Sequence, residues 1–325
     1  MKAITYTTYG APADVLAFGE VSAPRCGDDD VLIRVGGSSI NPADVYCVTG
    51  TPYMTRAMFG LRRPKRTTPG LDVAGTVEAV GVNVSSVSIG DEVYAESPKP
   101  GAFAELVAVP AAVVAPMPVG LSFGDAAAMP LAGCTALQAV RDKGKVAAGH
   151  RVLINGASGG VGTFAVQIAK ATGATVVGVC SARNIELVRS LGADSVIDYG
   201  AEDFTKGAEP YDVIIDFVGN RSWSECRSAL TPKGCLVMCA GGGGGQWLGP
   251  VPRIFKTMAG AVFASQRAEA LAAQATRADL IELGELVASG AVRPIVTARY
   301  PLSEVTAALE AQQAGHRQGK TVVTF

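Results

Sequence analysis

The sequence predicts an α/β protein in which a doubly wound parallel sheet is joined to a second, β-rich domain. The middle of the chain alternates short apolar strands with helical stretches, a pattern typical of a parallel sheet with helices on both faces. The first part contains short strands separated by turns and no long helix, which indicates an antiparallel barrel or rolled sheet. A length of 325 residues is enough for two domains, each with its own core.

The β-rich domain is expected to span residues 1–120. Its clearest strands are bounded by Gly, Pro and Asp, which favour turns. These strands are Val31–Val35, Gly75–Val80 and Glu92–Ala95.

The parallel α/β domain is expected to span residues 121–258. A helical stretch over Leu121–Lys143 leads into it. The predicted strands are Val152–Ile154, Thr175–Cys180, Ser195–Ile197, Val213–Phe217 and Cys235–Cys239. Helices are predicted between them, notably at Asn184–Leu191 and Ser222–Leu230.

Residues 259–325 do not continue the strand–helix alternation, so we expect them to return to and complete the first domain. Two helices are predicted here, at Arg277–Ser289 and Ser303–Ala314. Two short strands accompany them, at Pro294–Thr297 and Thr321–Thr324.

A glycine-rich run follows the first strand of the α/β domain and opens into the helical stretch Thr163–Lys170. Glycines let the backbone approach a pyrophosphate closely, and a helix N-terminus offers unpaired N–H groups and the positive end of its dipole. The strand–turn–helix order therefore predicts a dinucleotide-binding loop. Its residues are Gly156, Ala157, Ser158, Gly159, Gly160, Val161 and Gly162.

The end of the next strand distinguishes between nicotinamide cofactors. NAD-binding sites usually place Asp or Glu here to accept hydrogen bonds from the ribose hydroxyls, whereas this chain has Ser181, followed by Arg183. A carboxylate would repel a 2′-phosphate, but a hydroxyl and a guanidinium can bind it. The sequence therefore favours NADP(H); the alternative for Arg183 is a solvated residue at the start of a helix.

Further cofactor contacts are expected at the carboxyl ends of the later strands, where ligands of open α/β sheets bind. Tyr199 is predicted to reach the adenosine phosphate, with a half-buried packing role as the alternative. Val218 and Gly219 are predicted to line the nicotinamide ribose. Gly241 begins a run of five glycines that is expected to pass close to the nicotinamide, unless it is simply a surface loop.

Five segments in order along nearly the whole chain resemble the medium-chain dehydrogenase/reductases, and within them the zinc-independent quinone oxidoreductase branch. They are Asn41–Tyr46, Pro69–Val77, Leu131–Ala136, Gly156–Gly162 and Gly315–Val323. The resemblance implies a GroES-like catalytic domain and a Rossmann NADP(H)-binding domain, with the active site in the cleft between them. It also implies a homodimer or homotetramer and adds Thr135 to the cofactor contacts.

No metal site is expected. The zinc-dependent relatives carry a cysteine ligand early in the catalytic domain and a Gly-His-Glu ligand motif. By the resemblance, this chain holds Asn41 at the first position and Gly70-Leu71-Asp72 at the second, and their four-cysteine zinc lobe is absent. The two histidines, His150 and His316, precede a strand and lie in a C-terminal turn. Because a catalytic zinc needs three well-placed protein ligands, both histidines are interpreted as structural.

Without a metal to polarise an alcohol, the simplest chemistry is hydride delivery to an activated acceptor such as an enone, enal, quinone or enoyl thioester. By resemblance, Asn41 and Tyr46 are the catalytic residues, offering an amide donor and a phenol. The alternatives are a turn residue before Pro42 and a core tyrosine. Asp44 is interpreted as a capping carboxylate at a helix start.

The segment after this motif is expected to contact the acceptor. Tyr53, Met58 and Phe59 are predicted to line an apolar substrate wall. The basic run Arg62–Arg66 is more consistent with a solvated loop than with a site for an anionic substrate or partner.

Composition limits the remaining possibilities. A net charge of −1 and 48% hydrophobic residues give no electrostatic case for nucleic acid or an anionic membrane. No apolar run in the chain is long enough to span a bilayer, and the N-terminus reads as a strand. The seven cysteines include no Cys-x-x-Cys pair. These features predict a cytoplasmic protein. The leading hypothesis is an NADPH-dependent quinone or enone reductase. The alternatives are a non-catalytic NADPH-binding sensor or structural protein, and an NADP-dependent alcohol dehydrogenase.

Overall fold

The chain forms two compact units in a computed structural model that describes residues 1–239, 244–315 and 318–325. The first unit contains Met1–Cys134, Gln274–Gly290 and Pro294–Phe325. The second contains Thr135–Ala273 and Ala291–Arg293. No helix in the described ranges combines the length and apolar character needed to cross a membrane.

The first unit is built on an antiparallel sheet with one parallel pair, in the order β14-β15-β3-β4-β5-β7, with β6 also paired to β3. A small ribbon, β1-β2, stands apart. The strands are β1 (Lys2–Thr5), β2 (Ala17–Glu20), β3 (Asp30–Ile40), β4 (Asp72–Val80), β5 (Glu92–Glu96), β6 (Leu106–Pro110), β7 (Ala115–Pro116), β14 (Val296–Pro301) and β15 (Lys320–Thr324).

Alternation of side chains explains why β3 lines the core of this unit. Val31, Ile33 and Val35 are buried, whereas Arg34 between them is exposed, as expected when successive residues face opposite sides of a sheet. The helices are α1 (Pro12–Val15), α2 (Pro42–Thr49), α3 (Arg56–Phe59), α4 (Phe123–Ala127), α10 (Arg277–Ala288), α11 (Val305–Gln313) and the part of α5 (Pro130–Gln138) up to Cys134. Strand β15, near residue 325, pairs antiparallel with β3 of this unit.

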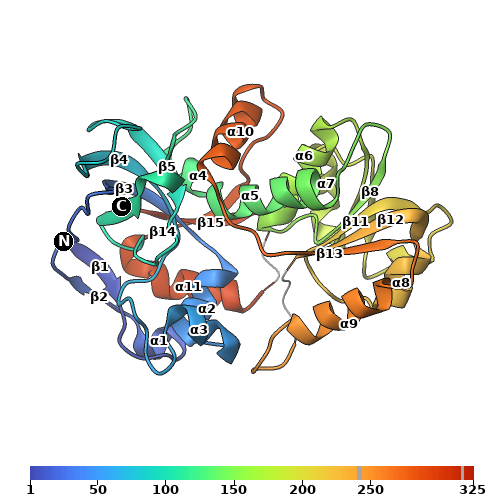
Figure 1. The fold of residues 1–325 in the computed structure, drawn as a ribbon, viewed down its shortest axis with the longest axis horizontal. Coiled ribbons are helices and arrows are strands. Elements are labelled where there is room, and N and C mark those ends of the chain that lie inside the picture. The colour runs from blue at the N-terminus through green and yellow to red at the C-terminus, as the bar shows by residue number, and fades with distance from the viewer. Residues whose placement is uncertain (240–243, 316–317) are drawn as a thin grey trace. The chain divides into compact units, whose positions relative to one another are not determined.

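The second unit is a parallel six-stranded sheet in the order β10-β9-β8-β11-β12-β13. Helices α6 and α7 lie on one side of the sheet and α8 and α9 on the other, which confirms the doubly wound architecture (Figure 1). The strands are β8 (Arg151–Asn155), β9 (Thr175–Cys180), β10 (Ser195–Asp198), β11 (Tyr211–Asp216), β12 (Leu230–Cys239) and β13 (Arg267–Leu271). The helices are α6 (Gly160–Ala171), α7 (Ile185–Ser190), α8 (Trp223–Ser228) and α9 (Val251–Ala261).

Two expectations are corrected. The alternation does not stop at residue 258, because α9 leads into β13, which pairs in parallel with β12 and extends the second unit to Ala273. The helical stretch over Leu121–Lys143 is divided into α4, α5 and a π-helical turn over Ala139–Lys143. Pro130 begins α5, in the first turn, where a missing N–H is tolerated, and it cannot continue a helix from before.

The boundary between the units also lies later than expected, between Cys134 and Thr135 rather than after residue 120. The reason is visible at the start of α5, where the backbone N–H of Leu131 donates to the Asp72 carboxylate over 3.0 Å. This bond ties the first part of α5 to β4 of the first unit.

Candidate functional site

The glycine-rich loop connects β8 to α6, as the sequence predicts. The N–H groups of Gly156 and Ala157 donate to the carbonyl of Val179 on β9, over 3.1 and 3.0 Å, which anchors the loop to the neighbouring strand. Gly156 has a φ of +89°, a conformation that a side chain would strain. At Gly162 an added Cβ would lie 2.1 Å from the Gly156 carbonyl oxygen, so only glycine allows the helix to approach the loop this closely.

The N-terminus of α6 presents unpaired donors. Gly159 is its cap residue and has no side chain with which to satisfy the first turn. The first intrahelical donor is the N–H of Thr163, which bonds to the Gly159 carbonyl. The N–H groups of Gly160 and Val161 therefore remain for a ligand at a partly exposed helix end, which suits a pyrophosphate.

The residues expected to select the cofactor lie at the ends of adjacent strands. Ser181 directly follows β9, and Arg183 is exposed on the short turn after it. Asp198 at the end of β10 is in register with Cys180, and the N–H of Tyr199 donates to the Cys180 carbonyl. The fold thus brings Tyr199, which is 53% exposed, beside the segment that carries Ser181 and Arg183.

Asn184 supports this region and was not anticipated. Its side chain is 6% exposed and donates to the Ser158 hydroxyl over 2.9 Å, which joins the glycine-rich loop to the segment after β9. The sequence places these residues 26 positions apart, and only the parallel pairing of β8 with β9 brings them together.

The loop after β11 is organised by Asp216, a buried carboxylate that accepts hydrogen bonds from the N–H groups of Val218 and Gly219 and from Asn155. Arg253 lies 3.4 Å from the same carboxylate. Val218 is therefore held partly exposed at the carboxyl edge of the sheet, where a cofactor contact was predicted. Gly241 lies outside the described residues, and Thr135 is half-buried on α5.

In the first unit, sheet register assembles a buried polar cluster. Asp72 on β4 is in register with Ser39 on β3 and with Glu96 on β5. Thr321 on β15 is in register with Ile40, which places Lys320 beside Asn41. Residues from four strands therefore meet where β3 ends and α2 begins.

Asn41 is at the centre of this cluster. Its Nδ2 donates to Asp72 over 2.8 Å, and its Oδ1 accepts from the Lys320 ammonium over 2.5 Å. The Lys320 nitrogen lies 3.8 Å from the Asp72 carboxylate, which also accepts from the Ser39 hydroxyl. Asn41 is 1% exposed and its amide is hydrogen-bonded at both ends within the cluster, and direct donation to a substrate stays a prediction.

Burial shifts the pKa values of the ionisable groups in this cluster. Asp44 caps α2 by accepting the Asn41 N–H over 2.8 Å, as the sequence suggests, while its other oxygen has no partner among the described residues. Burial, together with the nearby Asp72 charge, raises the pKa of Asp44 to about 8. Burial likewise raises the pKa of Glu96 to about 7 and lowers the pKa of Lys320, against the opposing pull of Asp72.

Tyr46 lies one turn along α2 and is half-buried. Burial raises the pKa of its phenol, which keeps the hydroxyl protonated near neutrality. A protonated phenol can donate a hydrogen bond or a proton, as the predicted role requires.

The expected substrate segment is held by Arg56, whose guanidinium lies between the rings of Tyr9 and Tyr53, 4.7 Å from each centroid. Its Nε also donates to the Gly50 carbonyl. Beyond this anchor, Met58 is 75% exposed and Phe59 is half-buried. The basic residues of the run 62–66 are exposed, as expected for a solvated loop.

Within the described ranges, no group of three or more His, Cys, Asp or Glu side chains is arranged to hold a metal ion. The Nδ1 of His150 accepts the N–H of Ala147 in the turn before β8, and His316 lies outside the described residues.

Comparison with known proteins agrees with this architecture. Residues 27–119 match the alcohol dehydrogenase GroES-like domain, and residues 191–323 match the zinc-binding dehydrogenase family. The chloroplast envelope quinone oxidoreductase homolog of Arabidopsis thaliana is 32% identical over 338 residues, covering 99% of this chain and 98% of that protein.

Two further similarities bear on the cofactor loop. The chloroplastic NADPH-dependent alkenal/one oxidoreductase of Arabidopsis thaliana is 34% identical, covering 99% of this chain and 79% of its own length. The structure of Escherichia coli quinone oxidoreductase complexed with NADPH is 27% identical and covers all of both chains with a TM-score of 0.83. The chain therefore belongs to the medium-chain dehydrogenase/reductase superfamily, in its quinone oxidoreductase-like branch.

Proposed function

We propose that this protein is an NADPH-dependent reductase that delivers hydride to a quinone or to the activated double bond of an enone or enal. The observation that carries the proposal is the glycine-rich loop with its unpaired helix N-terminus, next to a strand end that has Ser181 and Arg183 in place of an acid. Relatives that are named NADPH-dependent alkenal/one oxidoreductase and quinone oxidoreductase support the same activity.

The described residues fit this cofactor. The first-turn N–H groups of α6 suit the pyrophosphate, Ser181 and Arg183 suit the 2′-phosphate, and Val218 suits the nicotinamide ribose. NADPH supplies a hydride when it is bound. The chain itself contributes binding, orientation and stabilisation of the charge that develops on the acceptor oxygen.

For the acceptor, we propose Tyr46 as the donor and Asn41 as the residue that fixes the start of α2. The raised pKa of Tyr46 keeps its proton available to the enolate or quinolate oxygen that hydride addition produces. The bonds of Asn41 to Lys320 and Asp72 hold the helix that carries Tyr46 in one orientation.

The activity is tested with purified protein, NADPH and a panel of quinones, enals and enones. We expect loss of nicotinamide absorbance with at least one acceptor class, and slower turnover in Tyr46→Phe. Tight NADPH binding without oxidation of any acceptor would instead support a sensor or structural role.

The cofactor preference has its own test in Arg183→Ala. Loss of a charge-assisted contact to the 2′-phosphate should weaken NADPH binding by about 1.5–3 kcal/mol and leave NADH nearly unchanged. Titration calorimetry of both cofactors measures the difference, and equal losses would overturn the assignment to NADP(H).

We further propose that the reaction is independent of zinc. Where the resemblance places zinc ligands, this chain has Asn41 and Asp72, and the Lys320 ammonium already supplies a positive charge between them. An amide, one carboxylate and an ammonium make a poor donor set for zinc, which prefers three or four thiolate, imidazole or carboxylate ligands. Elemental analysis should show zinc far below one ion per chain, and turnover should survive a chelator.

We also propose a homodimer in a reducing compartment such as the cytoplasm. Strand β13 is the outer strand of its sheet and pairs with β12 on one side. Shortly before β13 in the chain, the apolar side chains of Val262 and Phe263 are 71% and 96% exposed. An outer strand beside exposed apolar side chains is common at protein interfaces. All seven cysteines are described and none forms a disulfide, as expected of a chain kept reduced. Light scattering after size-exclusion chromatography should give twice the chain mass, and a monomer or a tetramer would correct the proposal.

A further inference from the structure

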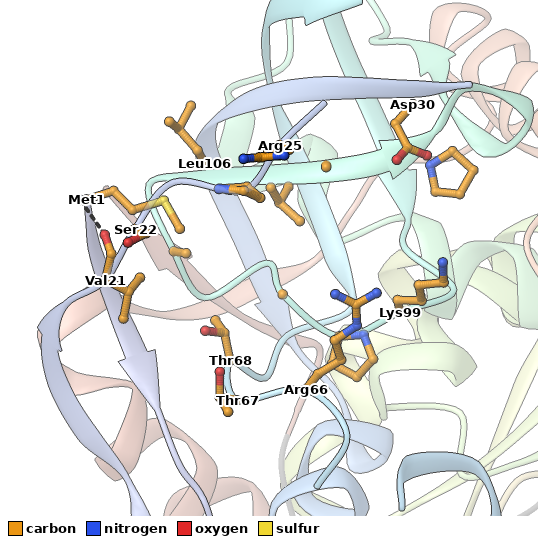
Figure 2. Close-up of a pocket in the computed structure, with 17 residues that line it drawn as sticks. Met1, Val21, Ser22, Arg25, Asp30, Arg66, Thr67, Thr68, Lys99 and Leu106 are labelled. Atoms are coloured by element: carbon orange, nitrogen blue, oxygen red, sulfur yellow. Dashed lines mark hydrogen bonds between the residues drawn. The ribbon is translucent and has the colours of Figure 1, made fainter. Parts of the chain in front are cut away.

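A pocket opens on the first unit, away from the cluster around Asn41. It has a volume of about 430 Å³, within the usual range of small-molecule sites. Figure 2 shows its walls, which come from β6, the segment after β2, and the loops around residues 66–68 and 99–101. Of the motifs in the sequence, the basic run Arg62–Arg66 contributes to it through Arg66.

Three positively charged side chains surround this pocket. Arg25 lies across it from Arg66 and Lys99 (Figure 2). None of these three side chains has an ion pair or a side-chain hydrogen bond with another described residue. Asp30 is the acidic side chain among the lining residues, so the pocket has an excess of two positive side-chain charges.

The lack of counterions is informative because the chain as a whole is close to neutral, with a net charge of −1. Some exposed cations of the described residues are paired, as Arg34 is with Glu78 and Lys170 with Asp194, whereas none of these three is. Three uncompensated cations around one hollow raise the local positive potential and favour an anion there.

The remaining lining groups define the shape of that anion. Ser22, Thr67 and Thr68 bring hydroxyl groups that can donate to oxygen atoms. Leu106, Ala108 and Pro110, alternate residues that share one face of β6, form an apolar wall. Guanidinium groups bind phosphate through two parallel N–H···O bonds, while the apolar wall suits the body of a small organic group.

We propose that this pocket is a binding site for a small organic phosphate monoester, with its phosphate between Arg25, Arg66 and Lys99 and its apolar body against β6. The site is separate from the dinucleotide loop and does not depend on the reductase activity. Bound there, a phosphorylated metabolite would be an effector or a second ligand of the enzyme.

The proposal is tested with 4-fluorophenyl phosphate, whose binding is followed by fluorine NMR. The protein is first saturated with NADP⁺, so that the probe cannot report on the dinucleotide loop. We expect saturable binding that weakens as salt is added, and at least about tenfold weaker binding in Arg66→Glu and in Lys99→Glu, because each substitution replaces an attractive contact with a repulsive one.

The matched control is Arg62→Glu, which makes the same charge change on an exposed residue of the same loop that does not line the pocket. It should bind the probe as wild type does. Neutral 4-fluorophenol should bind much more weakly, and inorganic phosphate should compete. The proposal fails if Arg66→Glu and Arg62→Glu bind equally, if the phenol binds as well as its phosphate, or if no saturable binding is seen.

Discussion

Lys320 brings a positive charge into a part of the first unit where Asp72 and Asp44 have no access to water. A buried charge is tolerated when it is paired and hydrogen-bonded, and Lys320 meets both conditions through Asp72, Asn41 and the Ile40 carbonyl. Removing one partner of such a group leaves the other charge uncompensated, which costs more than the pair itself contributes.

We therefore expect Lys320→Met to lower the free energy of unfolding by about 3–5 kcal/mol, the range found when a buried ion pair loses one partner. The double variant Lys320→Met/Asp72→Asn should recover part of this loss. Urea denaturation of the four proteins in the cycle gives the coupling energy.

Lys170→Met is the control for this prediction, since its ion pair with Asp194 is exposed on both sides. We expect it to cost less than about 1 kcal/mol. If the Lys320 and Lys170 variants lost the same stability, the buried cluster would not depend on the lysine charge.

Asp44 gives a pH-dependent prediction. Its pKa in the folded state is about 8, above its ordinary value of 3.8, so the folded state binds more protons than the unfolded chain between these two pH values. The stabilisation that comes from the raised pKa of Asp44 is fully present below pH 3.8 and is lost as the pH rises through 8. The free energy of unfolding should therefore fall over this window. Asp44→Asn should flatten the fall in Tm between pH 6 and pH 9, roughly the upper part of that range.

The pKa of Glu96 is also raised, to about 7, so its ionisation lowers stability over part of the same pH range. Comparing wild type with Asp44→Asn at each pH removes the effect of Glu96, because both proteins contain it. Glu186→Gln, a change at an exposed carboxylate, should follow the wild-type curve. Parallel curves for wild type and Asp44→Asn would show that Asp44 is ionised throughout.

At the residue scale, the sequence predicts the capping role of Asp44 and the alignment of Ser181, Arg183 and Tyr199 at strand ends, because these depend on local spacing and strand order. It does not predict the bonds of Asn41 to Lys320 and Asp72. Those partners are far apart in the chain, and their contact depends on the register of β15, β3 and β4, which no local pattern specifies.

At the level of elements, the close contact between α6 and the glycine-rich loop is the one most sensitive to an added side chain. In Gly162→Ala the added Cβ would lie 2.1 Å from a backbone oxygen, so the helix must move away from the loop. We expect a loss of about 1–3 kcal/mol of stability, typical of overpacking, and a clear loss of NADPH affinity. Gly19→Ala, where an added Cβ meets nothing within 4 Å, is the control, and both variants are compared by thermal unfolding and calorimetry.

A second prediction for an element concerns the segment from Gly50 to Gly60. Arg56→Ala removes the contacts to both tyrosine rings and the bond to the Gly50 carbonyl, so we expect faster hydrogen exchange across this segment. If Tyr53 contacts the acceptor, KM should rise while kcat changes little. The same measurements on Arg62→Ala should match wild type, and unchanged exchange in Arg56→Ala would remove its role as an anchor.

The order of most strands and helices follows from the periodicity of the sequence. The break between α4 and α5 and the presence of strand β13 do not. Helical spacing across Leu121–Lys143 hides the break before Pro130, and Arg267–Leu271 carries too many polar residues to indicate a strand of a parallel sheet. β13 forms because β12 offers an unpaired edge next to it, which is a property of the assembled sheet.

For the whole molecule, the division into two units predicts which backbone amides gain protection from hydrogen exchange when the cofactor binds. A ligand that binds the folded state stabilises it by mass action, by about 2.7 kcal/mol at a hundredfold excess over Kd. Saturating NADP⁺ should increase hydrogen-exchange protection in the second unit, around β8, α6 and β9, more than in β14 and β15 of the first. Arg183→Ala should reduce this gain at equal NADP⁺ concentration, and uniform protection of both units would show that they unfold together.

The position of β15 inside its sheet, between β14 and β3, has a consequence for synthesis of the chain. The second unit is almost continuous in sequence, so its sheet can form while the ribosome is still adding later residues. The first unit has to wait, because β15 is made after the other described strands of its sheet. Until β15 is made, Asp72 lacks its lysine, so β3 and β4 reach their native surroundings only after the second unit, which follows them in the chain, can fold.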